Sequence, residues 1–462
     1  MNITLHGAAG GVTGSAYFVE TADTRVLIDF GMFQGPRSES KNVVPPGLDP
    51  TRLDAVLLTH AHLDHCGRLP LLARNGFAKA IYATPATIEL AALIMRDSAK
   101  VQAQDADHEN RKRQRAGKPL LEPLYRAEHV EAILQQFRPV EFERPFEPAT
   151  GVTAEYFGAG HMLGSSSIQI TVRERGVAKK VLFSGDIGPE GLALIPPPNP
   201  RVGAELVFME STYGDRDHRP IGETLKEFRT IIDQAVQAKA RMIVPAFAVG
   251  RTQQIVYHLD ELFCAGALEP FPVYVDSPMA IAATEIYRKH PDLFDFDAQD
   301  MLRVCDIARR HGHVRATSTA QESMALNDVP GPCLIMAGAG MCNGGRILHH
   351  LKHGLWLPET VVMIVGYQSE GTLGRQLVDG AKTVTIFGEE VAVRAQIRTL
   401  NGFSAHAGQS QLLAWFEKIS SAKPTIALTH GEARGREPLA QLLRERHRLD
   451  PLLPMQGEVI PW

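Results

Sequence analysis

The chain has 462 residues, of which 44% are hydrophobic, so it is long enough for two domains or for one domain with a large insertion. Its formal net charge of −4 excludes an overall positive field that would recruit a polyanion, so such binding would need a local basic surface. The sequence has no signal-peptide pattern, no apolar run of the roughly 18–20 residues that a membrane span needs, and five cysteines without paired spacing. We therefore expect a cytoplasmic protein with no membrane contact and no disulfide framework.

The first 60 residues alternate short apolar runs with glycine-rich turns, which is typical of strands. Residues 16–20 and 25–29 predict two neighbouring strands, and Asp29 stands at the end of the second one. The apolar run at residues 55–58 predicts a buried strand that is followed by a polar loop.

The loop after that strand carries the strongest signal in the sequence. Three histidines and one carboxylate fall within six residues, and they are His60, His62, Asp64 and His65. Imidazole nitrogens and carboxylate oxygens together suit zinc, and a buried strand fixes the place where such a loop begins. Four donors this close cannot all bind one ion at good distances and leave it open to water. Two ions that share them are the better interpretation, and a polar surface loop is the alternative.

A long helix is predicted next, because residues 84–104 repeat apolar side chains on one face. Residues 105–118 are polar and contain the basic run RKRQR at 111–115, and we expect them to form an exposed excursion or the polar end of a helical hairpin. This run could contact nucleic acid, but a solvent-exposed helix face is the interpretation that we favour.

The strand pattern returns between residues 140 and 210, and the apolar run 181–186 ends at an acid. Residues 212–395 alternate helical and strand patterns, which predicts parallel strands connected by helices. The last part of the chain is predicted to add a strand at 396–400, a helix at 409–418 and a strand at 425–428.

Further donors of the same kinds stand at or near the ends of predicted strands. His161 lies in the glycine-rich run GAGHMLGS, Asp186 ends its strand, and His430 follows an apolar strand in LTHGE. With the loop cluster they make seven donors, which is enough for two ions that share one carboxylate and each keep a face for water. Taken alone, His161 and Asp186 are as readily structural as ligands and His430 is more readily structural, so their joint placement is what favours a metal site.

The order of these residues, with Asp29 before them, resembles the metallo-β-lactamase fold. Three further motifs are similar to those of its nucleic-acid-processing branch, the β-CASP nucleases: Glu210 in MESTYGDR, His406 in GFSAHA and His430 in LTHGE. That branch includes the nuclease subunit of the mRNA cleavage and polyadenylation factor and its bacterial and archaeal relatives. The resemblance covers nearly the whole chain, and a histidine at the last motif implies a member that acts on RNA.

The resemblance implies an α/β fold, namely an αββα metallo-β-lactamase sandwich with an inserted α/β β-CASP domain that has a parallel sheet and flanking helices. We expect the first part of the sandwich at residues 1–210 and the inserted domain at 211–395. The returning part of the sandwich, which carries the last two motifs, is expected at 396–462.

The resemblance also implies two zinc ions per chain and a role for each matched residue. The implied ligands of the first ion are His60, His62 and His161. Those of the second ion are Asp64, His65 and His430, and Asp186 would bridge the two. Asp29 would orient a ligand histidine through a hydrogen bond, and Glu210 would keep His406 protonated. The implied catalytic residues are thus His406, Glu210, Asp64 and Asp29.

These roles fit the chemistry of phosphodiester hydrolysis. Zinc binding lowers the pKa of water from about 15.7 to about 7, so a metal-bound hydroxide could attack phosphorus at neutral pH. Two ions can also offset the negative charge of the transition state. The leaving oxygen needs a proton, and a histidine beside a carboxylate has its protonated form favoured, as a general acid requires.

Two glycine-rich segments follow apolar strands, and each ends in an arginine. Candidate substrate contacts are Gly340 and Arg346 in the first segment and Ser369 and Arg375 in the second. Glycines let backbone N–H groups approach a phosphate, although a tight turn explains them equally well. Further candidate contacts are Arg251 and Ser277.

RNA is therefore the expected partner, and a homodimer is a further hypothesis. Two other functions stay open. One is a two-zinc hydrolase of a small ester or thioester, since a fold does not fix its substrate, and the other is a non-catalytic RNA-binding scaffold. The large inserted unit argues against the first, because a small substrate needs no such lid. The complete set of seven donors argues against the second.

Overall fold

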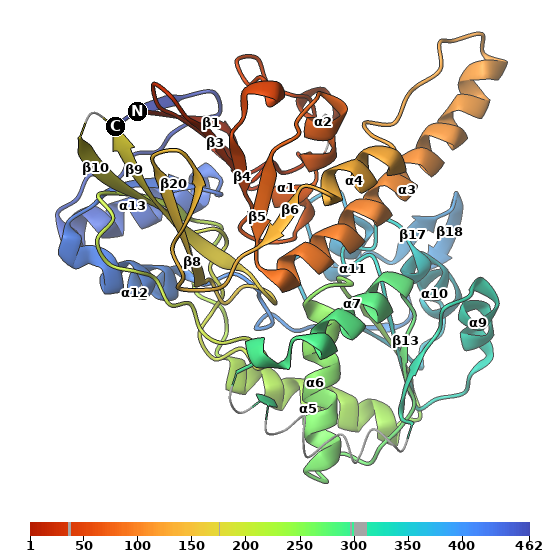
Figure 1. The fold of residues 1–462 in the computed structure, drawn as a ribbon. Coiled ribbons are helices and arrows are strands. Elements are labelled where there is room, and N and C mark those ends of the chain that lie inside the picture. Colours follow the sequence, from red (N-terminus) through yellow and green to blue (C-terminus); the bar gives the residue numbers. More distant parts are fainter. Residues whose placement is uncertain (36–37, 175, 296–297, 300–311) are drawn as a thin grey trace. The chain divides into compact units, whose positions relative to one another are not determined.

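The computed structural model of the chain describes residues 1–462 except 36–37, 175, 296–297 and 300–311 (Figure 1). Contacts between Cα atoms group the described residues into two compact units. The first unit contains Met1–Glu190, Pro197–Asp217 and His406–Trp462, and the second contains Gly191–Pro196 and His218–Ala405. The chain thus leaves the first unit and returns to it near the C-terminus.

The first unit contains two sheets, and the first of them has the strand order β21-β1-β2-β3-β4-β5-β6. Its strands are β1 Asn2–Gly7, β2 Ala16–Glu20, β3 Arg25–Ile28, β4 Ala55–Leu57, β5 Ala80–Ala83, β6 Phe137–Pro139 and β21 Val459–Pro461. β21, β1, β2 and β3 pair antiparallel, whereas β3 to β6 pair parallel. Parallel pairing brings the carboxyl ends of β3, β4 and β5 to one edge of the sheet, where loops can carry functional groups.

The second sheet of the first unit has the order β20-β11-β10-β9-β8-β7. Its strands are β7 Phe146–Ala149, β8 Val152–Gly158, β9 Ser166–Glu174, β10 Val177–Phe183, β11 Leu206–Glu210 and β20 Thr425–Thr429. β10, β11 and β20 pair parallel, so their carboxyl ends also lie at one edge. The strand β20 comes from the returning segment, and the sheet is therefore complete only with the C-terminal part of the chain.

An apolar core lies between these two sheets. Side chains such as Ile3 of β1 and Ile168 of β9 belong to one continuous cluster of buried residues. The helices of this unit are α1 Leu63–Cys66, α2 Leu69–Arg74, α3 Pro85–Arg115, α4 Ala127–Leu134, α12 Gln409–Ile419 and α13 Ala433–His447. Trp415 of α12 and Val207 of β11 share a second buried cluster, so α12 and α13 cover the outer face of the second sheet. The helices α1 to α4 lie beside the first sheet (Figure 1).

The second unit contains one six-stranded parallel sheet with the order β14-β13-β15-β12-β16-β19. Its strands are β12 Arg241–Pro245, β13 Val273–Val275, β14 Val314–Ala316, β15 Cys333–Ala337, β16 Thr360–Ile364 and β19 Gln396–Thr399, and a separate hairpin is formed by β17 Thr383–Ile386 and β18 Glu389–Ala392. The helices of this unit include α5 Ile221–Gln237, α6 Arg251–Cys264, α7 Pro278–Lys289, α9 Ala320–Ala325, α10 Arg346–Gly354 and α11 Leu373–Val378.

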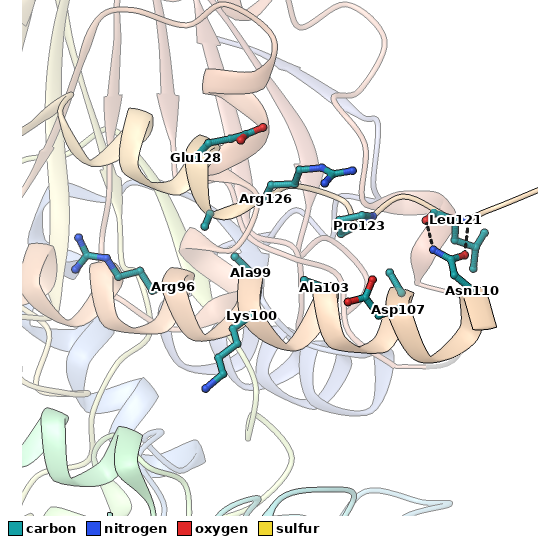
Figure 2. A pocket seen from close by; sticks show the side chains of 12 residues that line it. Arg96, Ala99, Lys100, Ala103, Asp107, Asn110, Leu121, Pro123, Arg126 and Glu128 are labelled. Atoms are coloured by element: carbon teal, nitrogen blue, oxygen red, sulfur yellow. Dashed lines mark hydrogen bonds between the residues drawn. The ribbon is translucent and has the colours of Figure 1, made fainter. Parts of the chain in front are cut away.

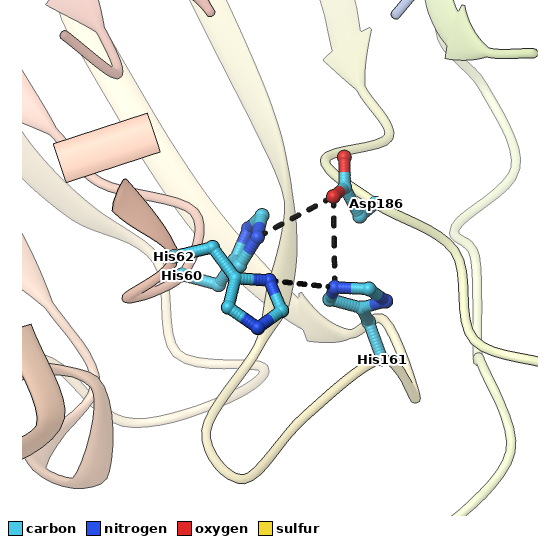
Figure 3. A group of neighbouring side chains, drawn as sticks. All are labelled: His60, His62, His161 and Asp186. Carbon is cyan, nitrogen blue, oxygen red and sulfur yellow. Dashed lines mark hydrogen bonds and ion pairs between the residues drawn. The ribbon is translucent and has the colours of Figure 1, made fainter. Parts of the chain in front are cut away.

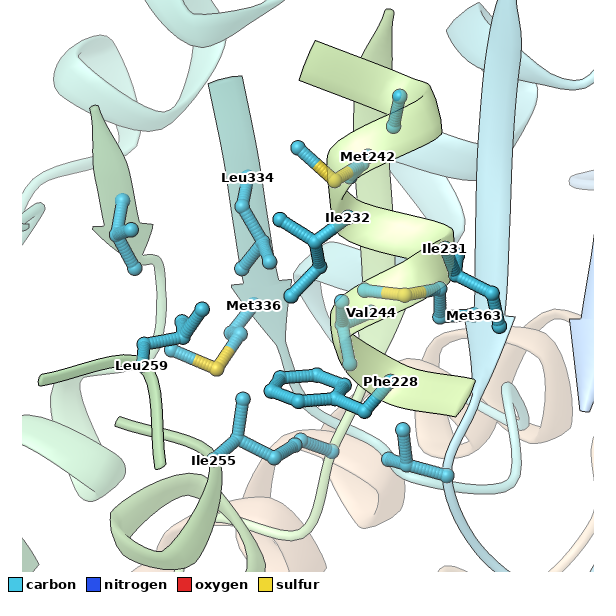
Figure 4. Packing of buried hydrophobic residues seen from close by; sticks show 14 of the residues in the cluster. Phe228, Ile231, Ile232, Met242, Val244, Ile255, Leu259, Leu334, Met336 and Met363 are labelled. Atoms are coloured by element: carbon cyan, nitrogen blue, oxygen red, sulfur yellow. The ribbon is translucent and has the colours of Figure 1, made fainter. Parts of the chain in front are cut away.

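Helices cover both faces of this parallel sheet. On one face Phe228 of α5 and Ile255 of α6 pack against Met242 of β12 (Figure 4). On the other face Ile347 of α10 packs against Ile243 of the same strand. A strand that is buried on both faces needs a continuous apolar run, which is why these strands are easy to find in the sequence.

Several predicted elements have different ends in the structure. Asp64 and His65 lie on the short helix α1 and not in a loop, and α3 continues from the predicted end near 104 to Arg115. Residues 396–399, predicted to belong to the returning segment, form β19, which pairs with β16 of the second unit. Cys264 is disulfide-bonded, although the sequence was expected to have no disulfide framework. The spacing of cysteines along the chain does not report which of them meet in space. Among the described residues no helix combines the length and the apolar character that crossing a membrane requires.

Candidate metal centre

All seven predicted metal donors lie in the first unit, on segments that follow its strands. The donors that come after β4 are His60, His62, Asp64 and His65. His161 lies between β8 and β9, Asp186 follows β10, and His430 follows β20. The parallel strands of the two sheets therefore bring donors together that are far apart along the chain.

The first group of donors contains His60, His62, His161 and Asp186, with one ligand atom from each residue within 4.8 Å of the others (Figure 3). Asp186 Oδ2 lies 3.5 Å from His60 Nε2 and 3.5 Å from His161 Nε2. His161 Nε2 in turn lies 2.9 Å from His62 Nδ1. His62 is half-buried and the other three residues are buried, so the group opens on the side of His62.

The second group contains Asp64, His65 and His430, again with ligand atoms within 4.8 Å of one another. His430 Nε2 lies 3.6 Å from Asp64 Oδ2 and 3.2 Å from His65 Nε2. The remaining oxygen of Asp186, Oδ1, lies 3.2 Å from His65 Nε2 and 3.5 Å from His430 Nε2. One oxygen of Asp186 thus faces each group.

Hydrogen bonds of Asp29 and Thr59 determine which ring nitrogens carry protons. Asp29 Oδ2 accepts from His65 Nδ1 at 2.7 Å and from Thr59 Oγ1 at 2.9 Å. Because the single hydroxyl proton of Thr59 is used in this way, its oxygen accepts from His60 Nδ1 at 3.1 Å. The Nε2 atoms of His60 and His65 then present lone pairs to Asp186, whose oxygens are acceptors too.

Acceptors that face one another in a buried site need a cation between them. His60 Nε2 and Asp186 Oδ1 are buried, and neither has a hydrogen-bond partner among the described residues. Burial lowers the pKa of His60 well below its usual value, which keeps this ring neutral. Although burial opposes the charge of Asp186, His430, His65 and His60 hold its pKa well below the usual range. A neutral imidazole and a charged carboxylate fit a pair of divalent cations.

The backbone around the donors is held in unusual conformations. Asp29 and His430 have left-handed backbones, with φ of 58° and 44°. Such conformations cost about 1 kcal/mol or more outside glycine, so their surroundings must hold them. The His430 N–H donates to Ala8 O at 2.6 Å. A Cβ atom on Gly31 would lie 1.5 Å from Asp64 O, so only glycine lets the chain pass this close to α1.

A histidine and a glutamate lie beside the donor groups. Glu210, at the end of β11, is buried, and its carboxylate accepts from Ile187 N at 2.6 Å and from Thr212 N at 3.2 Å. His406 Nδ1 lies 3.1 Å from Glu210 Oε1, and His406 Nε2 lies 3.9 Å from Asp186 Oδ2. Burial opposes the charge of His406, but Glu210 and then Asp186 raise its pKa to about 9. Because its side chain is 23% exposed, His406 can exchange protons with a ligand or with solvent.

The predicted substrate contact Arg346 belongs to a polar network in the second unit. Asp276 Oδ1 accepts from Arg346 Nη1 and from Thr317 Oγ1, both at 2.6 Å. Asp276 Oδ2 accepts from Ser323 Oγ at 2.5 Å and from His350 Nε2 at 2.6 Å. Burial opposes the charge of Asp276, yet these hydrogen bonds hold its pKa well below its usual range. Arg346 therefore ties α10 to the end of β13, and its contact with a substrate stays a prediction.

The other predicted substrate contacts also lie in the second unit. Arg375 pairs with Asp379 one turn later on the chain, at 2.8 Å. Ser277 caps α7 by accepting from Ala280 N. The Arg251 guanidinium lies 5.8 Å from the centre of the Phe403 ring. The remaining candidates in this unit are Gly340 and Ser369, and the contact of all five with a substrate stays a prediction.

Some residues that support the donors were missed by sequence reasoning. Thr59 precedes the donor loop directly, so its position was an available signal. Arg68 is buried, packs its guanidinium 4.3 Å from the centre of the Phe30 ring, and donates to the carbonyls of Gly14 and Gly31. It thereby fixes the segments on both sides of Asp29. Nothing in the sequence distinguishes Arg68 from an exposed arginine.

Comparison with known families gives matches along almost the entire chain. The Metallo-beta-lactamase superfamily matches residues 9–246, the Beta-Casp domain matches residues 252–377, and the Zn-dependent metallo-hydrolase RNA specificity domain matches residues 390–454. The chain is 39% identical over 463 residues to Ribonuclease TTHA0252 of Thermus thermophilus, with 100% of both chains covered. It is 28% identical to the RNase J-like protein of Methanocaldococcus jannaschii, with 99% of each covered.

A likeness in fold extends to a solved structure. A protein of unknown function from Enterococcus faecalis aligns with a TM-score of 0.57 and 14% identity, over 99% of each chain. The predicted fold class, a metallo-β-lactamase fold with a Beta-Casp domain and a parallel sheet, is confirmed by this likeness and by the family matches.

Proposed function

Since the chain belongs to the metallo-β-lactamase superfamily and carries a Beta-Casp domain, we propose that it is a zinc-dependent ribonuclease that hydrolyses phosphodiester bonds of RNA. The observation that carries this proposal is the convergence of seven donors, with the two oxygens of Asp186 facing different groups. The relatives named ribonuclease and RNase J-like protein support RNA as the substrate. A homodimer and a cytoplasmic location stay predictions from the sequence.

In this proposal two zinc ions are held per chain. The residues that would hold the first are His60, His62 and His161, and those that would hold the second are Asp64, His65 and His430. Asp186 would serve both ions. When bound, a pair of zinc ions activates water as a nucleophile and offsets the negative charge of a phosphodiester. Asp29 accepts from His65 Nδ1, and this hydrogen bond would leave His65 Nε2 available to hold an ion, as the outer partner of a ligand histidine does.

The residue that would donate the proton to the leaving oxygen is His406. Its Nδ1 faces Glu210, whose carboxylate is fixed by two backbone N–H groups, so the ring keeps its orientation. Its pKa of about 9, raised by Glu210 against the effect of burial, supports a protonated ring at neutral pH. His406 Nε2 then carries the proton on the side of Asp186, the carboxylate that would serve both ions.

The test is cleavage of an end-labelled, unstructured RNA by the purified full chain, with its zinc content measured in the same sample. We expect cleavage that a chelator stops and that added zinc restores. We also expect His406→Ala to lose cleavage and to keep two zinc ions per chain.

Two results would refute the proposal in different ways. Hydrolysis of a small ester or thioester panel without RNA cleavage would identify a small-substrate hydrolase. RNA that is bound but stays intact in the presence of zinc would identify a scaffold.

A further inference from the structure

The helix α3 is only partly packed against the first unit. It has 31 residues, from Pro85 to Arg115, and all of its buried residues lie between Ala86 and Ala99. No residue from Lys100 to Arg115 is buried. At 1.5 Å per residue this exposed half is about 24 Å long, and Figure 1 shows it extending away from the sheet beside which α3 begins.

The exposed half of α3 is nevertheless held in a defined shape by the segment that follows it. The Asn110 side chain donates to Leu121 O at 2.9 Å and accepts from Leu121 N at 2.7 Å (Figure 2). Arg113 Nε donates to Pro119 O at 2.7 Å, and Gly117, with φ of 65°, ends the helix in the left-handed conformation. The end of the helix and the turn after it are therefore preorganised.

The surface at this end has a single sign of charge. Residues 111–118, which we call the basic tip, read RKRQRAGK and contain five basic side chains and no acid. Lys112 lies 3.7 Å from Glu109, which is an exposed contact that is worth little. The described residues provide no carboxylate within 4 Å of the other four basic side chains, Arg111, Arg113, Arg115 and Lys118. The helix dipole favours basic residues in the last turn, but it does not explain a run that continues past the end of the helix.

The neighbouring groove on the same arm has a different character. It has a volume of about 570 Å³ and lies between α3 and residues 121–128 (Figure 2). Its lining combines the basic Arg96, Lys100 and Arg126 with the acidic Asp107 and Glu128, and Arg96 is paired with Glu131 at 2.7 Å. A mixed surface of this kind does not favour a polyanion, so the complementarity to a polyanion is confined to the basic tip.

The opposite end of α3 lies next to the metal donors. Thr84 and Thr87, at the start of the helix, both donate through their hydroxyl groups to Gly164 O, at 2.7 and 2.9 Å. Gly164 lies three residues after the donor His161. The 31 residues of α3 thus place its far end, where the basic tip lies, about 46 Å from the donor loop. At about 3.4 Å per nucleotide, a nucleic acid strand needs about 14 nucleotides to span this distance.

We propose that the basic tip binds the backbone of an RNA strand at a distance from the bond that is cleaved. The ligand chemistry is a row of phosphates, which five clustered cations on a preorganised turn complement without reading the bases. This inference rests on the proposed function, because it takes the substrate RNA as the ligand. It adds to that function a preference for long RNA over short RNA.

The test compares two triple variants of the full chain. The tip variant carries Arg111→Gln, Arg115→Gln and Lys118→Gln, which leaves the Arg113 contact in place and uses a good helix former. The control carries Lys79→Gln, Arg144→Gln and Lys180→Gln, three exposed residues away from the arm, so both variants lose the same charge. The probes are oligouridylates of six and of forty nucleotides. Binding is measured by fluorescence anisotropy in the zinc-loaded His406→Ala background, and cleavage is measured in the otherwise unchanged protein.

We expect the tip variant to bind the long RNA about 10–100-fold more weakly near 0.1 M salt. The slope of log K against log salt should fall by about 2, because three single-strand phosphate contacts are lost at about 0.7 each. Binding of the short RNA should not change, and the control should behave as the unsubstituted protein with both lengths. Circular dichroism checks that the tip variant stays folded.

Three outcomes separate this inference from the proposed function. If RNA is cleaved but the tip variant binds the long RNA as tightly as the control does, the basic tip does not bind RNA and the proposed ribonuclease activity is retained. If no RNA is cleaved but binding of the long RNA depends on the basic tip, the tip does bind RNA and the proposed ribonuclease activity is refuted. Equal weakening on short and long RNA would overturn the inference, because it would report a general effect of charge.

Discussion

Replacing Asp29 with asparagine should weaken the binding of one zinc ion without unfolding the first unit. Asparagine has the same size as aspartate and tolerates the left-handed backbone of Asp29. Its carbonyl oxygen can still accept from Thr59 N, as Asp29 Oδ1 does at 2.8 Å. Its amide group, however, meets three donors, Ser15 Oγ, Thr59 Oγ1 and His65 Nδ1, where Asp29 Oδ2 accepted from all three. His65 must then move its proton to Nε2, the atom that faces Asp186.

The expected magnitude follows from the position of Asp29 behind a single donor. Replacing such an outer hydrogen-bond partner lowers metal affinity by about 10–100-fold. This corresponds to about 1.4–2.8 kcal/mol, which is in the range of one hydrogen bond to a charged group. His65 belongs only to the group with Asp64 and His430, so the other ion should keep its affinity.

The assay is the zinc content per chain after equilibration with chelator buffers of graded free zinc. Asp54→Asn is the matched control, because Asp54 Oδ2 accepts a backbone N–H from Arg25 at 2.8 Å but touches none of the donors. We expect one of the two zinc ions of Asp29→Asn to dissociate at 10–100-fold higher free zinc, and both ions of the control to match the unsubstituted protein. Unchanged zinc affinity in Asp29→Asn, or an equal loss in Asp54→Asn, would refute the reasoning.

Three further predictions concern other residues. His406→Ala should lower kcat by about 10²–10⁴-fold and leave zinc at two per chain; a loss of zinc would make His406 a ligand. In the unsubstituted protein kcat should fall as the pH rises through about 9, where His406 loses its proton, and this limb should be missing from the pH profile of the variant. Asp276→Asn should lower the free energy of unfolding in urea by about 3–5 kcal/mol, because an amide removes the buried negative charge and keeps only one of the two acceptor oxygens that serve Arg346 and His350. Since the pKa of Asp276 is depressed in the folded state, the stability that this carboxylate adds is complete above about pH 4 and is lost as the pH falls. An Asp276→Asn variant as stable as the unsubstituted protein at pH 7 would contradict this prediction. Arg375→Gln should weaken RNA binding equally for all sequences and flatten its salt dependence, whereas a changed sequence preference would argue against a backbone contact.

The donor residues could be found in the sequence because their signal is local. His60 and His62 follow a strand that is buried on both faces, and such a strand reads as a short apolar run that ends at a polar loop. The same reasoning placed Asp186 and His430 behind β10 and β20. Buried strands with donors after them are therefore sufficient to suggest a metal site.

The pairing of these donors could not be predicted from local signals. The contact between His65 and His430 joins residues that are 365 positions apart, and only the order of the strands in the two sheets creates it. The same holds for Arg346, which the sequence suggested as a phosphate ligand and which the structure pairs with Asp276, 70 positions away. A side chain of the right type has several partners open to it, and tertiary contacts select among them.

The sequence pattern left the end of α3 open. Its apolar periodicity ends near Ala99, where the last buried residue lies, so pattern reasoning did not decide whether the helix continues beyond residue 104. The helix continues because its polar residues are good helix formers and because the returning segment is hydrogen-bonded to Asn110.

The position of His430 has a consequence for the newly made chain. A ribosome that adds about 5–20 residues per second needs roughly 20–75 s to proceed from His65 to His430, which are 365 residues apart. Until then the second donor group has no third member, and the sheet that carries Asp186 has no β20 at its edge. If cleavage needs both donor groups, as proposed, this ribonuclease cannot cut the messenger from which it is being translated until almost all of the 462 residues have emerged.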